Sequence, residues 1–295
     1  MNIYSKHINR ILEKKHGIKK KEPILISFSG GPDSLFLTEY LLQQNYQNLS
    51  LIYFNHHLRP LNEINKDITI CKNYAKKHSL PLTVKSLPIK AFIQKYHISE
   101  EEAGHVLRRS FLKHIASLKK YNIVMTGHHQ DDQIETILMH LKKGVHNLQL
   151  PIKEASQLNS KIKLLRPLLN IKKVDILNYL HEHNLNIVND ISNLETKYLR
   201  NHIRQKWIPF LNQTHPSFLK VLLKTCKIIE KATPQTSPFL IHITKNRLEL
   251  SIKNLSKNKD QISQQLYQMC QYYYSNIQKN SKKKLYFLDY HISAK

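Results

Sequence analysis

Glycine, cysteine and long apolar runs are scarce in this 295-residue sequence. It has six glycines, about 2% of the chain, against the ~7% typical of proteins. Its three cysteines, Cys71, Cys226 and Cys270, lie far apart and form no C-x-x-C pair, which argues against a cysteine-based metal cluster or zinc site and fits a reducing compartment. No apolar run approaches ~18 residues, so we expect no membrane-spanning segment.

Acidic side chains are also scarce, and this leaves a large positive charge. The chain has 46 Lys and Arg against 21 Asp and Glu, a formal net charge of +25. Such an excess favours a polyanionic partner, nucleic acid above all. A compositional bias towards solvated lysines is the alternative explanation. The length and a hydrophobic fraction of 41% suit one good-sized domain with a packed core and a smaller second domain.

Two of the few glycines are adjacent, in the hexapeptide SGGPDS at Ser29–Ser34, directly behind the apolar run Ile24–Phe28. The pattern predicts a buried strand, a tight turn and a helix that begins near Asp33. Such a turn points backbone N–H groups and the positive end of a helix at one spot, where a phosphate can bind. Asp33 adds a carboxylate for a metal ion. An ordinary strand-to-helix turn is the alternative, and the spacing is not that of a Walker A loop.

Short apolar runs recur at intervals near 30 residues and are separated by helical patterns. They are Ile24–Phe28, Leu51–Phe54, Leu82–Leu87 and Ile123–Met125. This alternation predicts an α/β fold with a doubly wound parallel sheet and ligand sites at the carboxyl ends of its strands.

The composition changes beyond His215, and we place a domain boundary near residue 212. Helical patterns run over Ile171–His183 and over Lys197–Lys206, the second ending at Pro209. For residues 213–295 we predict a smaller C-terminal α+β domain. Its expected elements are a helix over Val221–Ile229, strands at Phe239–Ile243 and Leu248–Ile252, and a helix over about 262–277.

The segment Gly127–Thr136 (GHHQDDQIET) follows the fourth apolar run and opens a helix. Asp132 and Glu135 are three residues apart, so their carboxylates share a helix face. Acidic groups in a first turn also suit the helix dipole, which is the structural alternative. His129 with Asp132 could suggest zinc, but no third ligand is nearby in sequence. Magnesium held by carboxylates and phosphates suits such an oxygen-rich site better.

Two further polar clusters stand out. Asn55–Arg59 (NHHLR) closes the second predicted strand, where His56 would border the adenine side of a nucleotide pocket; plain loop polarity is the alternative. In the second cluster Lys197, Arg200 and Arg204 are spaced as one basic helix face. That face suits a nucleic-acid backbone, or it belongs to an exposed amphipathic helix.

Together these motifs resemble those of the tRNA(Ile)-lysidine synthases, a family of N-type ATP pyrophosphatases in the PP-loop superfamily. The similarity runs from Ile24 to about Leu211. SGGPDS, NHHLR and GHHQDDQIET carry it, with RPLL at Arg166–Leu169 and the family-specific DISNLETKYLRNHIR at 190–204. One departure is Gly104–Arg109, which keeps only Arg108 of three side chains characteristic of the family.

The resemblance implies that residues 1–212 form an ATP pyrophosphatase catalytic domain with a helical, tRNA-contacting extension from about residue 164. ATP would adenylate O2 of cytidine 34 in the CAU anticodon of tRNA(Ile), and free L-lysine would then attack C2, giving lysidine, AMP and pyrophosphate. A carboxylate or His129 would accept the proton from lysine. The C-terminal domain would also bind tRNA.

The implied site residues fall into four groups. The catalytic ones are Asp33, His129, Asp132 and Glu135. Those for ATP are Ser29, Gly30, Gly31, Pro32, Asp33, Ser34 and His56. Those for tRNA are Arg166, Lys197, Arg200 and Arg204. Mg²⁺ would be held by Asp33, Asp132 and Glu135.

Two rival functions remain at this level. Another PP-loop tRNA-modifying enzyme, such as a 2-thiocytidine synthetase, typically needs paired cysteines, which are absent here. A catalytically inactive tRNA-binding relative would not be expected to keep Asp33, Asp132 and Glu135. We expect the protein in the cytoplasm, or in an organelle stroma if it is organelle-encoded. The sequence leaves the oligomeric state open, a homodimer included.

Overall fold

The computed structural model describes residues 3–142, 152–185, 199–232, 239–244 and 247–252, and the chain divides into two compact units. The first comprises residues 1–89 and 100–233, and the second residues 90–99 and 234–295. The first unit holds the sheet and all the predicted site residues that the structure describes. Within the described residues, no helix is long and apolar enough to cross a membrane.

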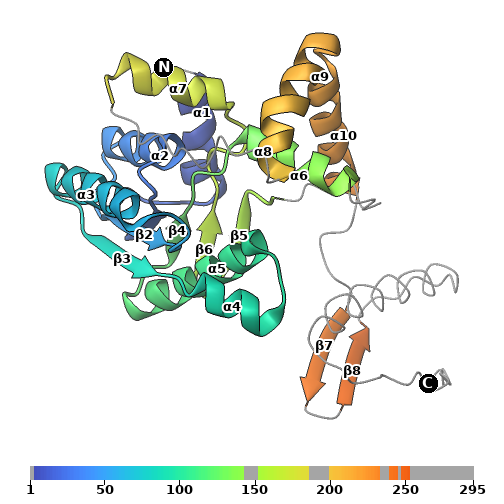
Figure 1. Cartoon of the computed structure of the whole chain (residues 1–295), viewed down its shortest axis with the longest axis horizontal. Coiled ribbons are helices and arrows are strands. Elements are labelled where there is room, and N and C mark those ends of the chain that lie inside the picture. Colours follow the sequence, from blue (N-terminus) through green and yellow to red (C-terminus); the bar gives the residue numbers. More distant parts are fainter. Residues whose placement is uncertain (1–2, 143–151, 186–198, 233–238, 245–246, 253–295) are drawn as a thin grey trace, which may run out of the picture. The chain divides into compact units, whose positions relative to one another are not determined.

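A six-stranded sheet forms the centre of the first unit (Figure 1). Its strands are β1 (Ile24–Ser27), β2 (Leu49–Asn55), β3 (Leu82–Ser86), β4 (Ile123–Met125), β5 (Ala155–Gln157) and β6 (Lys163–Leu165). They lie in the order β3-β2-β1-β4-β6-β5, and every neighbouring pair is parallel except β5 and β6. The predicted α/β class and the four predicted strands are confirmed.

The helices alternate with these strands along the chain. They are α1 (Ile3–Asn9), which continues as the π-helical η1 (Arg10–Lys15), α2 (Pro32–Gln43), α3 (Leu61–Lys77), α4 (Ile89–Tyr96), α5 (Glu100–Leu118), α6 (Gln130–Lys142), α7 (Lys173–Glu182), α8 (Leu199–His202), the π-helical η3 (Ile203–Trp207), α9 (Ile208–Thr214) and α10 (Phe218–Ala232).

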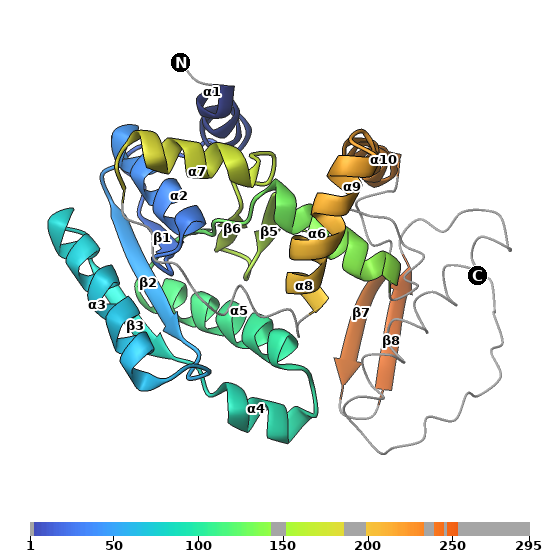
Figure 2. The same ribbon diagram turned by 45° about the horizontal axis from the view of Figure 1, so that its top comes forward.

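Helices cover both faces of the sheet, because the strands are apolar on both sides. Ile26 and Met125 belong to a buried cluster that also holds side chains of α1, α2, α3 and α7. Leu25 and Val124, which are equally buried, alternate with them and therefore point to the opposite face. Figure 2 shows α5 on the side of the sheet away from α2 and α7. This two-sided cover is the doubly wound arrangement.

The sequence did not reveal β5 and β6. Each has three residues, and neither belongs to the apolar runs on which the strand predictions were based. Backbone pairing makes β6 a strand: Val124 of β4 lies opposite Leu164, and the carbonyl of Asn122 accepts the Lys163 N–H at 2.9 Å.

The helical segment that contains Arg200 and Arg204 also differs from expectation at its end. Pro209 does not terminate it, since the chain continues into α9 with the proline in its first turn, where no backbone N–H is needed.

The helix α10 is part of the first unit. Its side chains Leu219, Leu223 and Cys226 share a buried cluster with Ile137 and Leu138 of α6. The compact unit therefore extends to residue 233, past the boundary near 212 that the sequence predicts.

In the second unit, β7 (Phe239–Thr244) and β8 (Arg247–Ile252) pair antiparallel, which confirms the two predicted strands. The helix predicted over about 262–277 lies outside the described residues.

Candidate functional site

The SGGPDS and GHHQDDQIET motifs meet where the strand order changes direction. β1 connects to β2 on one side and pairs with β4 on the other, so their carboxyl ends lie together at a topological switch point, where open α/β sheets bind ligands. SGGPDS follows β1, and GHHQDD follows β4. A Cβ added to Gly127 would lie 2.9 Å from the carbonyl carbon of Asp33, so a glycine there allows the two loops to touch.

The hydroxyl of Ser34 holds the hexapeptide in its tight turn. Ser34 Oγ accepts the Ser29 N–H at 3.1 Å and donates to the Gly31 carbonyl at 3.1 Å. Gly30 has a φ of 76°, in the left-handed region that favours glycine. Pro32 begins α2, so Asp33 lies in the first turn of that helix, as the sequence predicts.

His129 lies between the two predicted catalytic aspartates. Its Nε2 is 3.6 Å from Asp33 Oδ1 and 3.5 Å from Asp132 Oδ2, and only 3% of the side chain is exposed. Its Nδ1 accepts the Asp131 N–H at 3.2 Å, so the neutral imidazole carries its proton on Nε2. The imidazole therefore offers an N–H to the aspartates.

Asp132 is held in its ionised form. Burial alone raises the pKa of its carboxyl, but His129, His128 and Arg200 together with a hydrogen bond from the His129 N–H at 2.9 Å outweigh burial and lower that pKa.

Glu135 is fully buried and is bound by two arginines from the segment after residue 198. Arg204 Nε and Nη2 donate to its two oxygens at 2.6 and 3.0 Å, and Arg200 Nε donates at 2.8 Å. Arg200 also reaches Asp132 and Glu101 at 3.5 and 3.3 Å. The two arginines predicted for tRNA thus contact carboxylates of the predicted catalytic set.

The three carboxylates predicted for Mg²⁺ do not come together as one ligand set. Within the described residues, no group of three His, Cys, Asp or Glu side chains is placed to hold a metal ion. Both oxygens of Glu135 are occupied by arginines. Asp33 and Asp132, on either side of His129, still fit Mg²⁺, because this ion is usually held by one or two carboxylates plus substrate phosphates.

Arginines and histidines from three other segments surround this site. The pKa of His128 is lowered, first by burial and then by Arg166, Arg200 and Arg108, against the opposing effect of Asp132. Burial, with Arg108 and Arg59, lowers the pKa of His56 to about 4, so this side chain is neutral at pH 7.

Arg166 is 8% exposed. Its Nη1 donates to the Lys153 carbonyl at 2.8 Å and to Ser156 Oγ at 3.3 Å. This arginine therefore ties β6 to the neighbouring edge of the sheet, and its tRNA role stays a prediction. Lys197, the other basic residue predicted for tRNA, lies outside the described residues.

Sequence reasoning missed Lys173, at the start of α7. Its Nζ lies 2.5 Å from Asp33 Oδ1. No local pattern marks this lysine, because its position depends on β6, which the sequence did not reveal.

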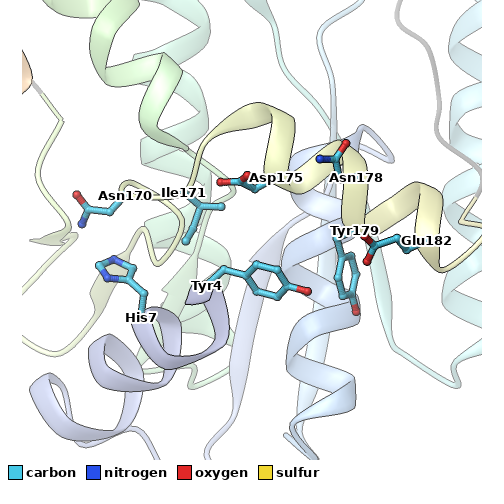
Figure 3. Close-up of a pocket in the computed structure, with 8 residues that line it drawn as sticks. All are labelled: Tyr4, His7, Asn170, Ile171, Asp175, Asn178, Tyr179 and Glu182. Carbon is cyan, nitrogen blue, oxygen red and sulfur yellow. The ribbon is translucent and has the colours of Figure 1, made fainter. Parts of the chain in front are cut away.

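A cavity of about 430 Å³ lies elsewhere, between α1 and α7 (Figure 3). Tyr4, His7 and Tyr179 line it together with residues of α7 and the segment before it, and none of the predicted ATP-binding residues does. The nucleotide prediction therefore depends on the loops at the switch point and not on this cavity.

Comparison with known proteins decides the family. The PP-loop domain matches residues 2–211, which is most of the chain. The chain belongs to the PP-loop family. Members of this family bind ATP, the ligand that the sequence predicts for the turn at Ser29–Ser34.

The predicted resemblance to the lysidine synthases is confirmed. The tRNA(Ile)-lysidine synthase of Bacillus subtilis is 29% identical over 260 residues, which cover 88% of this chain and 54% of the relative. That of Persephonella marina is 33% identical over 214 residues, 70% of this chain and 45% of the relative. The chain spans 39% to 54% of the length of such curated relatives.

A solved PP-loop structure supports the fold. The U34-tRNA thiolase from Methanococcus maripaludis superposes with a TM-score of 0.61 at 18% identity, covering 78% of this chain and 79% of the thiolase. At this identity the likeness concerns the fold alone.

Proposed function

We propose that this protein uses ATP to join free L-lysine to C2 of cytidine 34 in the CAU anticodon of tRNA(Ile), through a cytidine adenylated on O2, with release of pyrophosphate and AMP. The observation that carries the proposal is the contact of Arg200 and Arg204 with Glu135. Those arginines belong to the motif specific to lysidine synthases, and Glu135 lies on α6 in the GHHQDDQIET motif, which the sequence assigns to the catalytic site. The two motifs therefore build one site.

The residues at the switch point suit the adenylation step. The backbone of Ser29–Ser34 and the first turn of α2 would hold the departing pyrophosphate, as a preorganised electrostatic site. Asp33 and Asp132 would hold Mg²⁺, which neutralises charge on the leaving phosphate oxygens when bound. His56, kept neutral by burial, would pack beside the nucleotide without adding charge.

The second step requires an acceptor for a proton of the attacking lysine amine. In the neutral state His129 carries its proton on Nε2, so that nitrogen has no free lone pair with which to accept another. Asp132 is ionised and lies next to it. We therefore assign the proton acceptor to the Asp132 carboxylate, with the His129 N–H orienting it.

The test is to incubate the protein with ATP, labelled lysine and unmodified CAU-anticodon tRNA(Ile). We expect label in the tRNA and one pyrophosphate released per lysine joined. A tRNA with uridine at position 34 is the control and should take no label. Pyrophosphate release without lysine transfer, or incorporation of sulfur from a donor, would instead favour another PP-loop modification. No reaction with ATP at all would favour a tRNA-binding relative.

Replacing Asp33 with Asn probes the chemistry within this assay. The variant should fold normally, since this carboxylate is about one third exposed, and should lose most activity because a charge at the Mg²⁺–phosphate site is removed. Near-normal turnover with magnesium as the only divalent metal would contradict the assignment.

We also propose that residues beyond 233 bind the body of the tRNA, away from the anticodon. The proposal rests on the surplus of positive charge and on a chain that continues past the first unit. Ending the chain after residue 233 keeps α10 and its apolar contacts, which a cut after Leu211 would remove. The shorter protein should lose more activity on full-length tRNA than on an anticodon stem-loop. Equal losses on both substrates would mean that the segment stabilises the catalytic unit instead.

A further inference from the structure

Lys173 occupies a position that the motifs do not explain. Its Nζ lies 2.5 Å from Asp33 Oδ1, across 140 residues of sequence. The hexapeptide Ser29–Ser34 contains no basic side chain, although its proposed ligand is a polyphosphate. A cation must come from elsewhere in the fold, and Lys173 already touches the loop.

The backbone fixes this lysine beside the two loops. The Gln130 N–H donates to the Ile171 carbonyl at 2.9 Å, and the Lys173 N–H donates to Asp131 Oδ1 at 3.3 Å. Both bonds join the beginning of α7 and the residues just before it to the first turn of α6, directly after the loop that follows β4. Lys173 is also the first residue of the helix, so the positive end of α7 is held at the same place.

The ion pair is exposed enough to exchange partners. The Lys173 and Asp33 side chains are 28% and 30% exposed, in contrast to the fully buried Glu135. A partly exposed pair of this kind contributes little to stability. Phosphate oxygens carry more charge than one carboxylate and attract an ammonium group more strongly.

We propose that Lys173 is a phosphate-binding residue, which exchanges Asp33 for the β- and γ-phosphates when ATP binds and stays with pyrophosphate as it departs. Asp33 is released at the same moment and is free to hold Mg²⁺. No covalent bond changes in this exchange. The inference rests on the proposed use of ATP, and it assigns to α7 the cation that the hexapeptide lacks.

The experiment measures binding of inorganic pyrophosphate, ATP and AMP to the whole chain in the presence of Mg²⁺, without tRNA or lysine. Lys173→Met should weaken pyrophosphate and ATP binding about tenfold or more, because a charged hydrogen-bond donor is lost. AMP, which has neither a β- nor a γ-phosphate, should bind within about twofold of the parent. Lys173→Arg should keep most of the affinity. Lys172→Met, at the exposed neighbouring position, is the matched control and should change nothing.

A purely structural role would give a different pattern. If Lys173 only neutralises Asp33, its removal should have no effect once Asp33 is replaced by Asn. The proposal predicts that Asp33→Asn with Lys173→Met still binds pyrophosphate about tenfold more weakly than Asp33→Asn alone. Loss of this difference, or equal weakening of AMP and pyrophosphate, would overturn it. Because the binding assay contains no tRNA, a negative result would overturn the role of Lys173 without deciding whether the protein forms lysidine. Conversely, failure to form lysidine would not change the result of the binding assay.

Discussion

The contact of Arg200 and Arg204 with Glu135 leads to a prediction about folding stability. Glu135 is fully buried, and its oxygens accept three N–H donors at 2.6 to 3.0 Å. Replacing both arginines with Ala leaves a buried carboxylate without a cation, which costs roughly 3–5 kcal/mol. At about 2–4 °C per kcal/mol for a domain of this size, the melting temperature should fall by roughly 6–20 °C.

Single and triple variants separate the charge effect from lost packing. Arg204→Ala removes two of the three contacts but leaves the one from Arg200, so it should cost less than the double variant. Adding Glu135→Gln to the double variant removes the unpaired charge and should recover part of the lost stability. Lys206→Ala, exposed on the same helical segment, is the control.

Thermal unfolding followed by circular dichroism tests this prediction, with tRNA binding measured across a range of salt concentrations. If the double variant melts within about 1 °C of the parent, the ion pairs do not stabilise the fold. If the melting temperature is unchanged but tRNA affinity and its salt dependence fall, the arginines contact phosphates, as the sequence predicts. Retained tRNA binding with lost stability would assign them to the fold.

Two further predictions follow from the same region. Gly127→Ala should push the two loops apart, because its Cβ would lie 2.9 Å from the Asp33 carbonyl carbon, and should lower ATP turnover in a steady-state assay by about 10²-fold. Gly104→Ala is the control: its Cβ would meet only Ile89, at 3.5 Å, so this variant should keep full activity. The pKa of His56 is lowered to about 4 in the folded protein, whereas in the unfolded chain this side chain takes up a proton near pH 6.5. The contribution of neutral His56 to the free energy of unfolding, at most about 3 kcal/mol, should therefore be lost as the pH falls from about 6.5 to 4. His56→Gln should flatten urea-unfolding stability over that range and the exposed His114→Gln should not; an unchanged slope in the first variant would refute the assignment.

Local patterns were enough to predict the centre of the fold. β1, β2 and β4 contain the apolar runs Ile24–Ile26, Leu51–Phe54 and Ile123–Met125 because both of their faces are buried, and a glycine pair follows the first of them. β5 and β6 were not predicted, because three residues are too few to show a pattern and because pairing with neighbouring strands, not composition, makes them strands.

The partners of charged residues could not be read from the sequence. The spacing of Arg200 and Arg204 does place both on one helix face, but periodicity does not say what that face meets. In the structure that face meets the carboxylate of Glu135, which lies 65 residues before Arg200 in the sequence. Lys173 was missed for the same reason, since its contact with Asp33 spans 140 residues.

The acidic residues of the site show how the scarce negative charge is used. Asp33 meets Lys173, Asp132 meets His129, and Glu135 meets two arginines. Two of these carboxylates thus position cations, a lysine and two arginines, near the loop at Ser29–Ser34, and the third contacts an imidazole. A polyphosphate that enters such a site competes with carboxylates for cations already in place. The exposed pair can yield its cation to the ligand, whereas the buried pair cannot do so without stranding a charge. Exposure therefore separates the group that takes part in binding from the group that holds the site together.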